Sequence, residues 1–367
     1  MATVSPEVLQ RISYAVYDDV FNRKKPIIVD RKDLAVHAML MKRKSSSGQA
    51  GGTTTIKLQK DGGFTMQFWE RRDPLAFQEA NIELELEFPF TNVHQGFEIV
   101  HEDLYKMGYL VKPNGTGKAS SAASRLSEDE VNVLVDWFDR VLEEWDDSFD
   151  RNLEVAWCRD GSYNTKAPVG LDGLINLSPT TGTIGGKSRS NPLLQHTVST
   201  GLTTTATTGT LITGMTAARR AANTMSRGSG TPSGGIDMIL VGDSFLDAYV
   251  EYARNNGIQY QKQVGGPISK LDLGIPESGY EFEGIPLVRA VVFADLDILE
   301  PTATIPWRKR AYMLNSKSLH FLEMAGLDKF QSRAADPSDQ RVSRFSMDGR
   351  YCLAVSAPNR NALVTVA

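Results

Sequence analysis

The chain has 367 residues, a net charge of −4 and 41% hydrophobic residues, as expected for a globular protein with two or three cored domains. It contains no run of about 18 apolar residues, so no membrane span is expected. The N-terminus lacks the basic start and apolar core of a signal peptide, and the two cysteines, Cys158 and Cys352, lie far apart. These features argue against secretion by that route, a disulfide framework and a cysteine-rich zinc site.

The N-terminal third alternates between a predicted helix and predicted strands. Ser5 followed by Pro6 is typical of a helix start and predicts a helix over 5–22. Residues 53–60 and 64–70 are expected to pair as a hairpin around the glycine-containing turn 61–63.

Residues 81–90 alternate strictly and predict a strand with one apolar face and one face formed by Glu83, Glu85 and Glu87. Like charges on one strand face are unfavourable unless cations lie opposite them. The candidate cations, on the same subunit or a neighbour, are Lys57, Lys60, Arg71 and Arg72.

A long amphipathic helix is predicted over 127–157. Ser127 and Glu130 form a capping box, and an apolar stripe follows from Val131 to Phe149. At 1.5 Å per residue this helix would be a rod of roughly 45 Å. It is either an ordinary core helix or a spine that carries other elements.

The charge is unevenly distributed along the chain. Arg23–Lys44 has a balance of +6, whereas Leu126–Glu154 has a balance of −9. Opposite charges of this size indicate that the two segments meet, within or between subunits. The alternative is that the basic stretch contacts nucleic-acid phosphates.

The remainder contains β-type pieces over 167–198 and further elements that alternate between helix and strand. The pattern predicts helices over 214–230 and 243–257, and strands over 236–242, 284–293, 310–322 and 351–366.

The stretch Thr180–Pro192 contains Gly-Gly-Lys-Ser, which is also the end of a phosphate-binding loop. That loop requires a glycine where the chain has Thr181, and a helix directly afterwards. Asn191 precedes a proline, and such a residue disfavours helical geometry. We therefore interpret the glycines as a turn between strands and predict that Lys187 binds no phosphate.

No catalytic or metal site emerges. Gly-Asp-Ser at 242–244 resembles the start of some serine esterases, but His320 lacks the Asp that those enzymes place three residues before their histidine. Ser244 is better explained as a helix N-terminal residue. The histidines show no zinc or iron spacing. We predict no enzyme activity and no cofactor.

Residues 170–192 resemble the segment after the long helix in major capsid proteins of tailed bacteriophages. The shared pattern is Gly-Leu-Asp at 170–172, Thr-Gly-Thr-x-Gly-Gly at 181–186, Arg189 and then Asn-Pro. The stretch from Tyr312 also resembles their Tyr-x-Leu-Asn strand, whereas Leu193-Leu194 stands where those proteins often have a tryptophan. With the order of elements along nearly the whole chain, the resemblance implies the α+β Hong Kong 97-type capsid fold.

The resemblance implies five parts: an N-terminal arm (1–45), an extended loop (46–95), a peripheral domain (96–234) with the spine helix, an axial domain (235–310) and return strands (311–367). Gly185-Gly186 would form a tight turn with positive φ at the edge of the peripheral domain. Only a short arm would precede the fold, so any scaffold is expected to be a separate or removed protein.

The implied function is a major capsid protein that assembles as pentamers and hexamers into an icosahedral shell around double-stranded DNA. Expected partners are the DNA, bound non-specifically, and scaffolding, portal and decoration proteins, but no membrane. The location would be the virion, and the host cytoplasm during assembly. The alternatives are an encapsulin-like compartment shell and a serine hydrolase or nucleotide-binding enzyme.

Because the family runs its arm beside the spine, arm–spine contact ranks above genome contact. The predicted inter-subunit residues are Lys24, Lys25, Lys32, Lys57, Lys60, Arg71, Arg72, Glu83, Glu85, Glu87, Asp139, Glu143 and Asp147.

Overall fold

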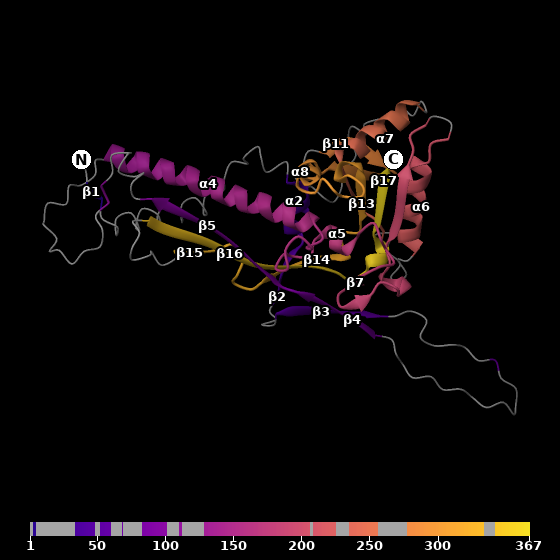
Figure 1. Cartoon of the computed structure of the whole chain (residues 1–367), viewed down its shortest axis with the longest axis horizontal. Coiled ribbons are helices and arrows are strands. Elements are labelled where there is room, and N and C mark those ends of the chain that lie inside the picture. Colours follow the sequence, from indigo (N-terminus) through magenta and orange to yellow (C-terminus); the bar gives the residue numbers. More distant parts are fainter. Residues whose placement is uncertain are drawn as a thin grey trace. The chain divides into compact units, whose positions relative to one another are not determined.

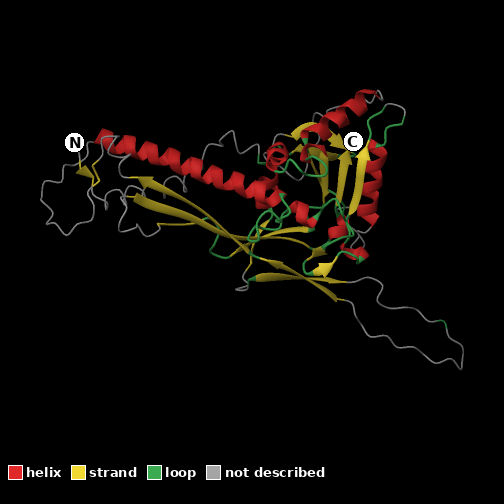
Figure 2. Cartoon of the chain, in the orientation of Figure 1, coloured by secondary structure: helices red, strands yellow, loops and turns green. Residues whose placement is uncertain are grey.

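The computed structural model describes residues 3–4, 34–47, 52–59, 68, 83–100, 110–111, 128–205, 208–224, 235–255, 277–333 and 342–367. Figures 1 and 2 show the helices and strands of these residues. The described residues fall into two compact units. The first takes its described residues from Met1–Arg31, Asn92–Leu153 and Gly326–Arg350, and the second from Lys32–Thr91, Glu154–Ala325 and Tyr351–Ala367.

The first unit packs a helix on strands. Helix α4 (Glu128–Cys158) has 31 residues, and all but its last five belong to this unit. Strand β16 (Val342–Val355) pairs with β15 (Phe330–Arg333) and with β5 (Thr91–Val100). Phe97 of β5 meets Trp145 of α4 edge-on at 4.7 Å between ring centroids and stacks on Phe345 of β16 at 4.9 Å. The unit also contains a short parallel pair, β1 (Thr3–Val4) with β6 (Leu110–Val111).

The second unit is built on a six-stranded sheet with the order β11-β12-β10-β13-β17-β9. Its strands are β9 (Thr197–Leu202), β10 (Met238–Val241), β11 (Glu277–Phe282), β12 (Ile285–Arg289), β13 (Arg310–Leu314) and β17 (Ala362–Val366). Strand β10 pairs parallel with β12 and antiparallel with β13. All four β10 residues are buried, as expected for an apolar strand covered on both faces.

The two faces of this sheet are covered differently. Helices α6 (Leu211–Thr224) and α7 (Asp243–Asn255) share one apolar core with Ala311 and Met313 of β13. Tyr312 lies between those two residues and so points to the opposite face. There it packs against aromatic residues of α8 (Val292–Leu299) and the 3-10 helix η4 (Trp307–Lys309).

Smaller elements complete the second unit. Strand β14 (Leu319–Met324) pairs with the last residues of β16 and with β2 (Lys44–Ser47), which follows helix α2 (Ala35–Lys42). Strands β3 (Thr53–Gln59) and β4 (Glu83–Pro89) form a two-stranded ribbon. The rest are α5 (Leu171–Leu174), β7 (Thr183–Ile184), β8 (Lys187–Ser188), η2 (Pro192–Leu194) and η5 (Pro358–Arg360).

Several predicted elements are confirmed. The long helix runs over 128–158 against the predicted 127–157, the buried strand is β10, and the helix after it is α7. Helix α6 begins at Leu211, three residues before the predicted start. The predicted helix over 5–22 lies outside the described residues.

Strand β3 pairs along its whole length with β4. The predicted partner segment 64–70, apart from Phe68, lies outside the described residues, so that hairpin stays a prediction. Three predictions were wrong in detail. The strand predicted over 284–293 ends at Arg289, because the apolar residues after it face the core from helix α8. The strand predicted over 310–322 is two strands, β13 and β14, separated by an Asn-Ser turn. The strand predicted over 351–366 is interrupted by η5, which starts at a proline.

The predicted domain boundary at 234 separates elements that share one core. Leu202 of β9 and Met215 of α6 belong to the same buried cluster as Ile239 of β10. The five-part division of the chain stays a prediction.

Candidate assembly site

The glycine-rich stretch is a small hairpin. Strands β7 and β8 pair antiparallel around Gly185 and Gly186, whose φ angles are +52° and +75°. Two central residues with positive φ define the turn that suits a two-residue hairpin, and glycine adopts it without strain. The next helix, η2, has three residues and is capped by the Asn191 side chain. No helix N-terminus lies behind Lys187, so the phosphate-loop geometry is absent from this described stretch.

A buried cluster of hydrogen bonds follows this hairpin. It joins the side chains of Arg189 and His196 to backbone carbonyls, and we call it the clasp. Arg189 is 1% exposed, and its guanidinium donates to the carbonyls of Gly173 and Leu174 at 2.6 and 2.9 Å. The ring of His196 lies 3.3 Å from the same guanidinium and 2.6 Å from the Asn176 carbonyl. Burial lowers the pKa of His196 to about 4; the bond to the Asn176 carbonyl opposes this, and the Arg189 charge adds to it. The histidine is therefore neutral and accepts from Arg189.

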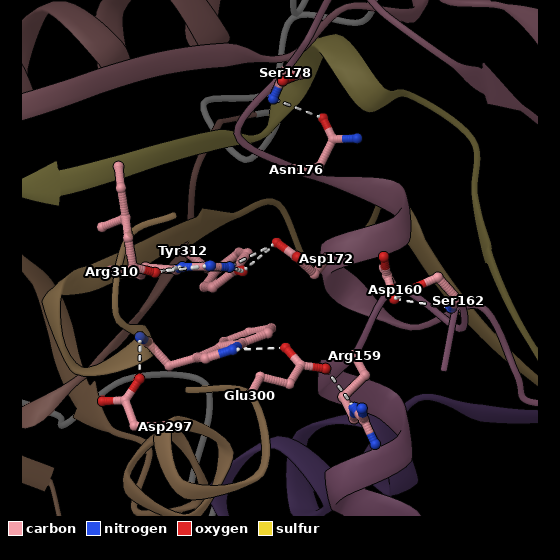
Figure 3. Close-up of polar contacts among 12 residues, drawn as sticks. Arg159, Asp160, Ser162, Asp172, Asn176, Ser178, Asp297, Glu300, Arg310 and Tyr312 are labelled. Carbon is pink, nitrogen blue, oxygen red and sulfur yellow. Dashed lines mark hydrogen bonds and ion pairs between the residues drawn. The ribbon is translucent and has the colours of Figure 1, made fainter. Parts of the chain in front are cut away.

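The Gly-Leu-Asp motif supplies a second buried contact. Asp172 accepts hydrogen bonds from Arg310 and from the Tyr312 hydroxyl, both at 2.9 Å (Figure 3). The Arg310 guanidinium also donates to the Ile305 carbonyl and lies 4.2 Å from the centre of the Trp307 ring. Burial raises the pKa of Asp172, and the Arg310 charge and the Tyr312 bond oppose that rise. This contact joins the segment after α4 to the first residues of β13.

A second contact of this kind is made by Glu300, the residue just after α8. Its carboxylate accepts from the Trp307 indole at 3.0 Å and from Arg159 at 2.6 Å (Figure 3). Asp297 accepts from the backbone N–H of Trp307. The end of α4, the end of α8 and the start of β13 are thus linked by buried or half-buried polar groups that satisfy one another.

The ribbon β3–β4 has the predicted alternation. Leu86 and Phe88 are buried, whereas the three glutamates are exposed. Lys57 lies 3.1 Å from Glu85 and 3.6 Å from Glu83. These bonds and charges, Glu85 first, raise the pKa of Lys57. The predicted cation therefore lies on the same subunit, across the ribbon.

The fold of the chain is similar to that of solved capsid structures. No protein-family model and no curated protein matches the sequence. A chain of the cyanophage A-1(L) capsid asymmetric unit is 15% identical, with a TM-score of 0.62 over 94% of this chain and 96% of that one. The chain has the Hong Kong 97-type capsid fold. A chain from Mycobacterium phage Bobi is 10% identical, with a TM-score of 0.50 over 90% of each chain.

Within this capsid fold the predicted contact residues have different positions. Lys24, Lys25, Lys32, Lys60, Arg71 and Arg72 lie outside the described residues. Asp139 belongs to α4, Glu143 is half-buried, and Asp147 is only 9% exposed. The contacts of these residues with the arm or with a neighbouring subunit stay a prediction.

Partners of the described basic stretch and of the spine were not anticipated. Arg43 lies 4.0 Å from Asp237, and Lys44 lies 2.8 Å from Glu323. On the spine, Lys329 lies 2.7 Å from Asp146 and 2.6 Å from Asp150. Arg189, Arg310 and Lys329 also have buried partners that the sequence did not indicate, because their neighbours in sequence include serine, lysine or aspartate and give no sign that the charge is buried.

The remaining reactive groups of the capsid fold are dispersed. In the part of the chain that the structure describes, no three His, Cys, Asp or Glu side chains gather as metal ligands. Cys158 and Cys352 are free and buried. Ser244 lies in the first turn of α7, as predicted. None of the helices described is long and apolar enough to cross a lipid bilayer.

Proposed function

We propose that this chain is a major capsid protein that assembles as pentamers and hexamers into a closed shell. The observation that carries the proposal is the match to the cyanophage A-1(L) capsid chain over nearly the full length of both chains. A match over 94% of this chain and 96% of that one supports the same use of the fold.

The ribbon β3–β4 provides independent physical support. Its apolar face is buried at Leu86 and Phe88 but only half-buried at Ile56, Leu58 and Leu84. A two-stranded ribbon is marginally stable in water and needs a further covering surface. On α8, Ile298 is 75% exposed and Leu299 is 54% exposed. Neighbouring subunits of a ring would cover such surfaces.

The partners belong to the same proposal. The shell would enclose double-stranded DNA without sequence preference and would take up scaffolding, portal and decoration proteins, first in the host cytoplasm and finally in the virion. The net charge of −4 suits a container that does not hold its DNA through many phosphate contacts. The role is structural, without catalysis.

The test is expression of the chain, alone and with the scaffolding protein encoded beside it, followed by size-exclusion chromatography and negative-stain imaging. We expect rings or closed shells. A stable monomer under both conditions would overturn the proposal. Shells that contain an enzyme and no nuclease-protected DNA, when isolated from the native source, would favour a compartment shell instead.

A further inference from the structure

The glycine hairpin makes one backbone contact with the ribbon. The N–H of Glu87 in β4 donates to the carbonyl of Gly185 at 3.1 Å. A methyl group on Gly185 would lie 2.7 Å from the Leu86 Cβ and 3.2 Å from the Glu87 nitrogen. Leu86 and Ile184 are both buried at this contact. The hairpin therefore meets β4 backbone to backbone, at a spacing that only glycine allows.

The contact uses the free edge of the ribbon. The opposite edge of β4 pairs with β3, from Thr53 opposite Pro89 to Gln59 opposite Glu83. Alternate residues of a strand direct their N–H groups to the same edge, so Glu87 shares its outward edge with Pro89. Proline lacks an N–H and is tolerated at such an edge. The N–H of Glu87 thus points away from β3. Through this donor, the glycine hairpin binds the outer edge of the ribbon.

The hairpin is itself anchored. Its base is closed by the Arg189 N–H, which donates to the Gly182 carbonyl at 3.0 Å. The Arg189 side chain then reaches the carbonyls of Gly173 and Leu174 at the end of α5. The hairpin is thus fixed on α5 through Arg189 and contacts β4 through Gly185. The position of the hairpin therefore determines the position of the ribbon at this contact.

We propose that the hairpin Gly182–Arg189 is a bracket that sets the direction in which the ribbon leaves the body, with Gly185 as its positioning residue for shell assembly. This inference rests on the proposed capsid function. The described ribbon extends about 20 Å at roughly 3.3 Å per residue, so a tilt of about 10° at its base displaces its far end by about 3.5 Å. Docking of specific surfaces does not tolerate such a displacement.

The matched variants are Gly185→Ala and Gly186→Ala. Both positions have positive φ, so both substitutions strain the turn, but a methyl group on Gly186 meets nothing within 4 Å. The difference between the two variants isolates the contact with β4. The readouts are amide hydrogen exchange of Glu87 in dissociated subunits, with β10 amides as a folding control, and the yield of closed shells.

We expect Gly186→Ala to match the parent within about twofold in both readouts. In Gly185→Ala, the amide of Glu87 should exchange at least about tenfold faster than in the parent. The β10 amides should remain protected, and most of the closed shells should be lost. Equal behaviour of the two variants would overturn the bracket. Faster exchange with a normal shell yield would overturn its role in direction.

If the β10 amides of Gly185→Ala lose their protection, a comparison of Glu87→Pro with Glu87→Ala tests the contact instead. Both variants lose the carboxylate, and only the proline removes the backbone N–H donor. The bracket predicts faster exchange at Leu86 and fewer shells for Glu87→Pro, and equality of the two would refute it. If the parent forms no shells at all, the capsid function fails, while the exchange difference still reports on the contact.

Discussion

Glu154, in the last turn of α4, accepts a hydrogen bond from the backbone N–H of Val36 at 2.8 Å, although 118 residues separate them in sequence. Val36 lies in the first turn of α2, and Leu34 at the N-cap provides no side-chain bond. Glu154 is 1% exposed, so a buried carboxylate caps a helix from a distant segment.

We therefore expect Glu154→Ala to destabilise the chain by about 1–2 kcal/mol, the usual effect of losing a cap or a buried acceptor. Glu154→Gln should cost less because its amide oxygen still accepts. Urea unfolding gives the free energy, and hydrogen exchange of the α2 amides gives the location. Unchanged α2 protection in Glu154→Ala would contradict this role.

Lowering the pH should reduce the free energy of unfolding of the second unit, and His196 is the group responsible. The unfolded histidine binds a proton near pH 6.5, whereas the folded one does so at about 4, so the unfolded state binds more protons in between. Stability is complete above about pH 6.5 and falls as the pH drops toward 4, by up to about 3 kcal/mol. Urea midpoints from pH 7 to 4 measure the slope, which should be flatter in His196→Gln. Parallel slopes would show that the clasp does not titrate.

Lys329 should stabilise the spine helix. Lys329 lies between Asp146 and Asp150, and all three side chains are buried or nearly so. Removing one partner of a buried ion pair costs about 3–5 kcal/mol because it leaves charge uncompensated. Lys329→Met should approach this loss in urea unfolding, and Lys329→Arg should retain most of the stability. Equal stability of the two variants would show that packing, and not charge, is what the site requires.

Contact between the arm and the spine remains a prediction. Reversing Lys24, Lys25 and Lys32 to Glu should impair assembly of empty shells, because several surface pairs of about 0–1 kcal/mol each are lost together. Partial rescue is expected from reversing Asp139, Glu143 and Asp147 to Lys.

A control for total charge is available on the described surface. Lys166, Arg254 and Lys317 are exposed and lie outside the glycine hairpin, so their reversal to Glu changes the net charge equally. We expect this control to assemble. Should the arm variant form empty shells normally and fail only to retain DNA, the basic stretch faces the genome and the arm–spine contact is wrong.

Nucleotide binding is the simplest prediction to check. Lys187 is exposed on a two-residue strand, and the 3-10 helix after it has three residues. Calorimetry should detect no ATP binding in the parent or in Lys187→Ala. Micromolar binding that is lost in the variant would mean that the hairpin rearranges around phosphate.

The sequence periodicity predicted the helices and strands in which the spacing of apolar residues matches the buried face. The stripe of α4, the apolar run of β10 and the alternation of β4 were readable because burial follows the period of a helix or strand. The pairing of Lys57 with Glu83 and Glu85 was also accessible, since a row of like charges needs cations opposite.

Contacts between residues that are far apart in sequence could not be predicted. Nothing near residues 53–60 indicates that strand β3 finds its partner in residues 83–89. In the same way, Asp172, Arg310 and Lys329 have no local signal for the charge that each one meets. Such contacts are set by the closure of the fold, where a buried charge has to find a partner.

The order of the six-stranded sheet has a consequence for how the chain is made. Strand β17 lies between β13 and β9, and Val364 and Val366 contribute to the core under α6. Strand β9 ends at Leu202, so about 160 residues must still be translated before β17 begins, which takes roughly 10–30 s at 5–20 residues per second. Through that interval β9 lacks the strand that joins it to the sheet. A nascent chain therefore cannot form the complete sheet, and the surfaces of that sheet become available for contacts with other molecules only after β17 has been translated.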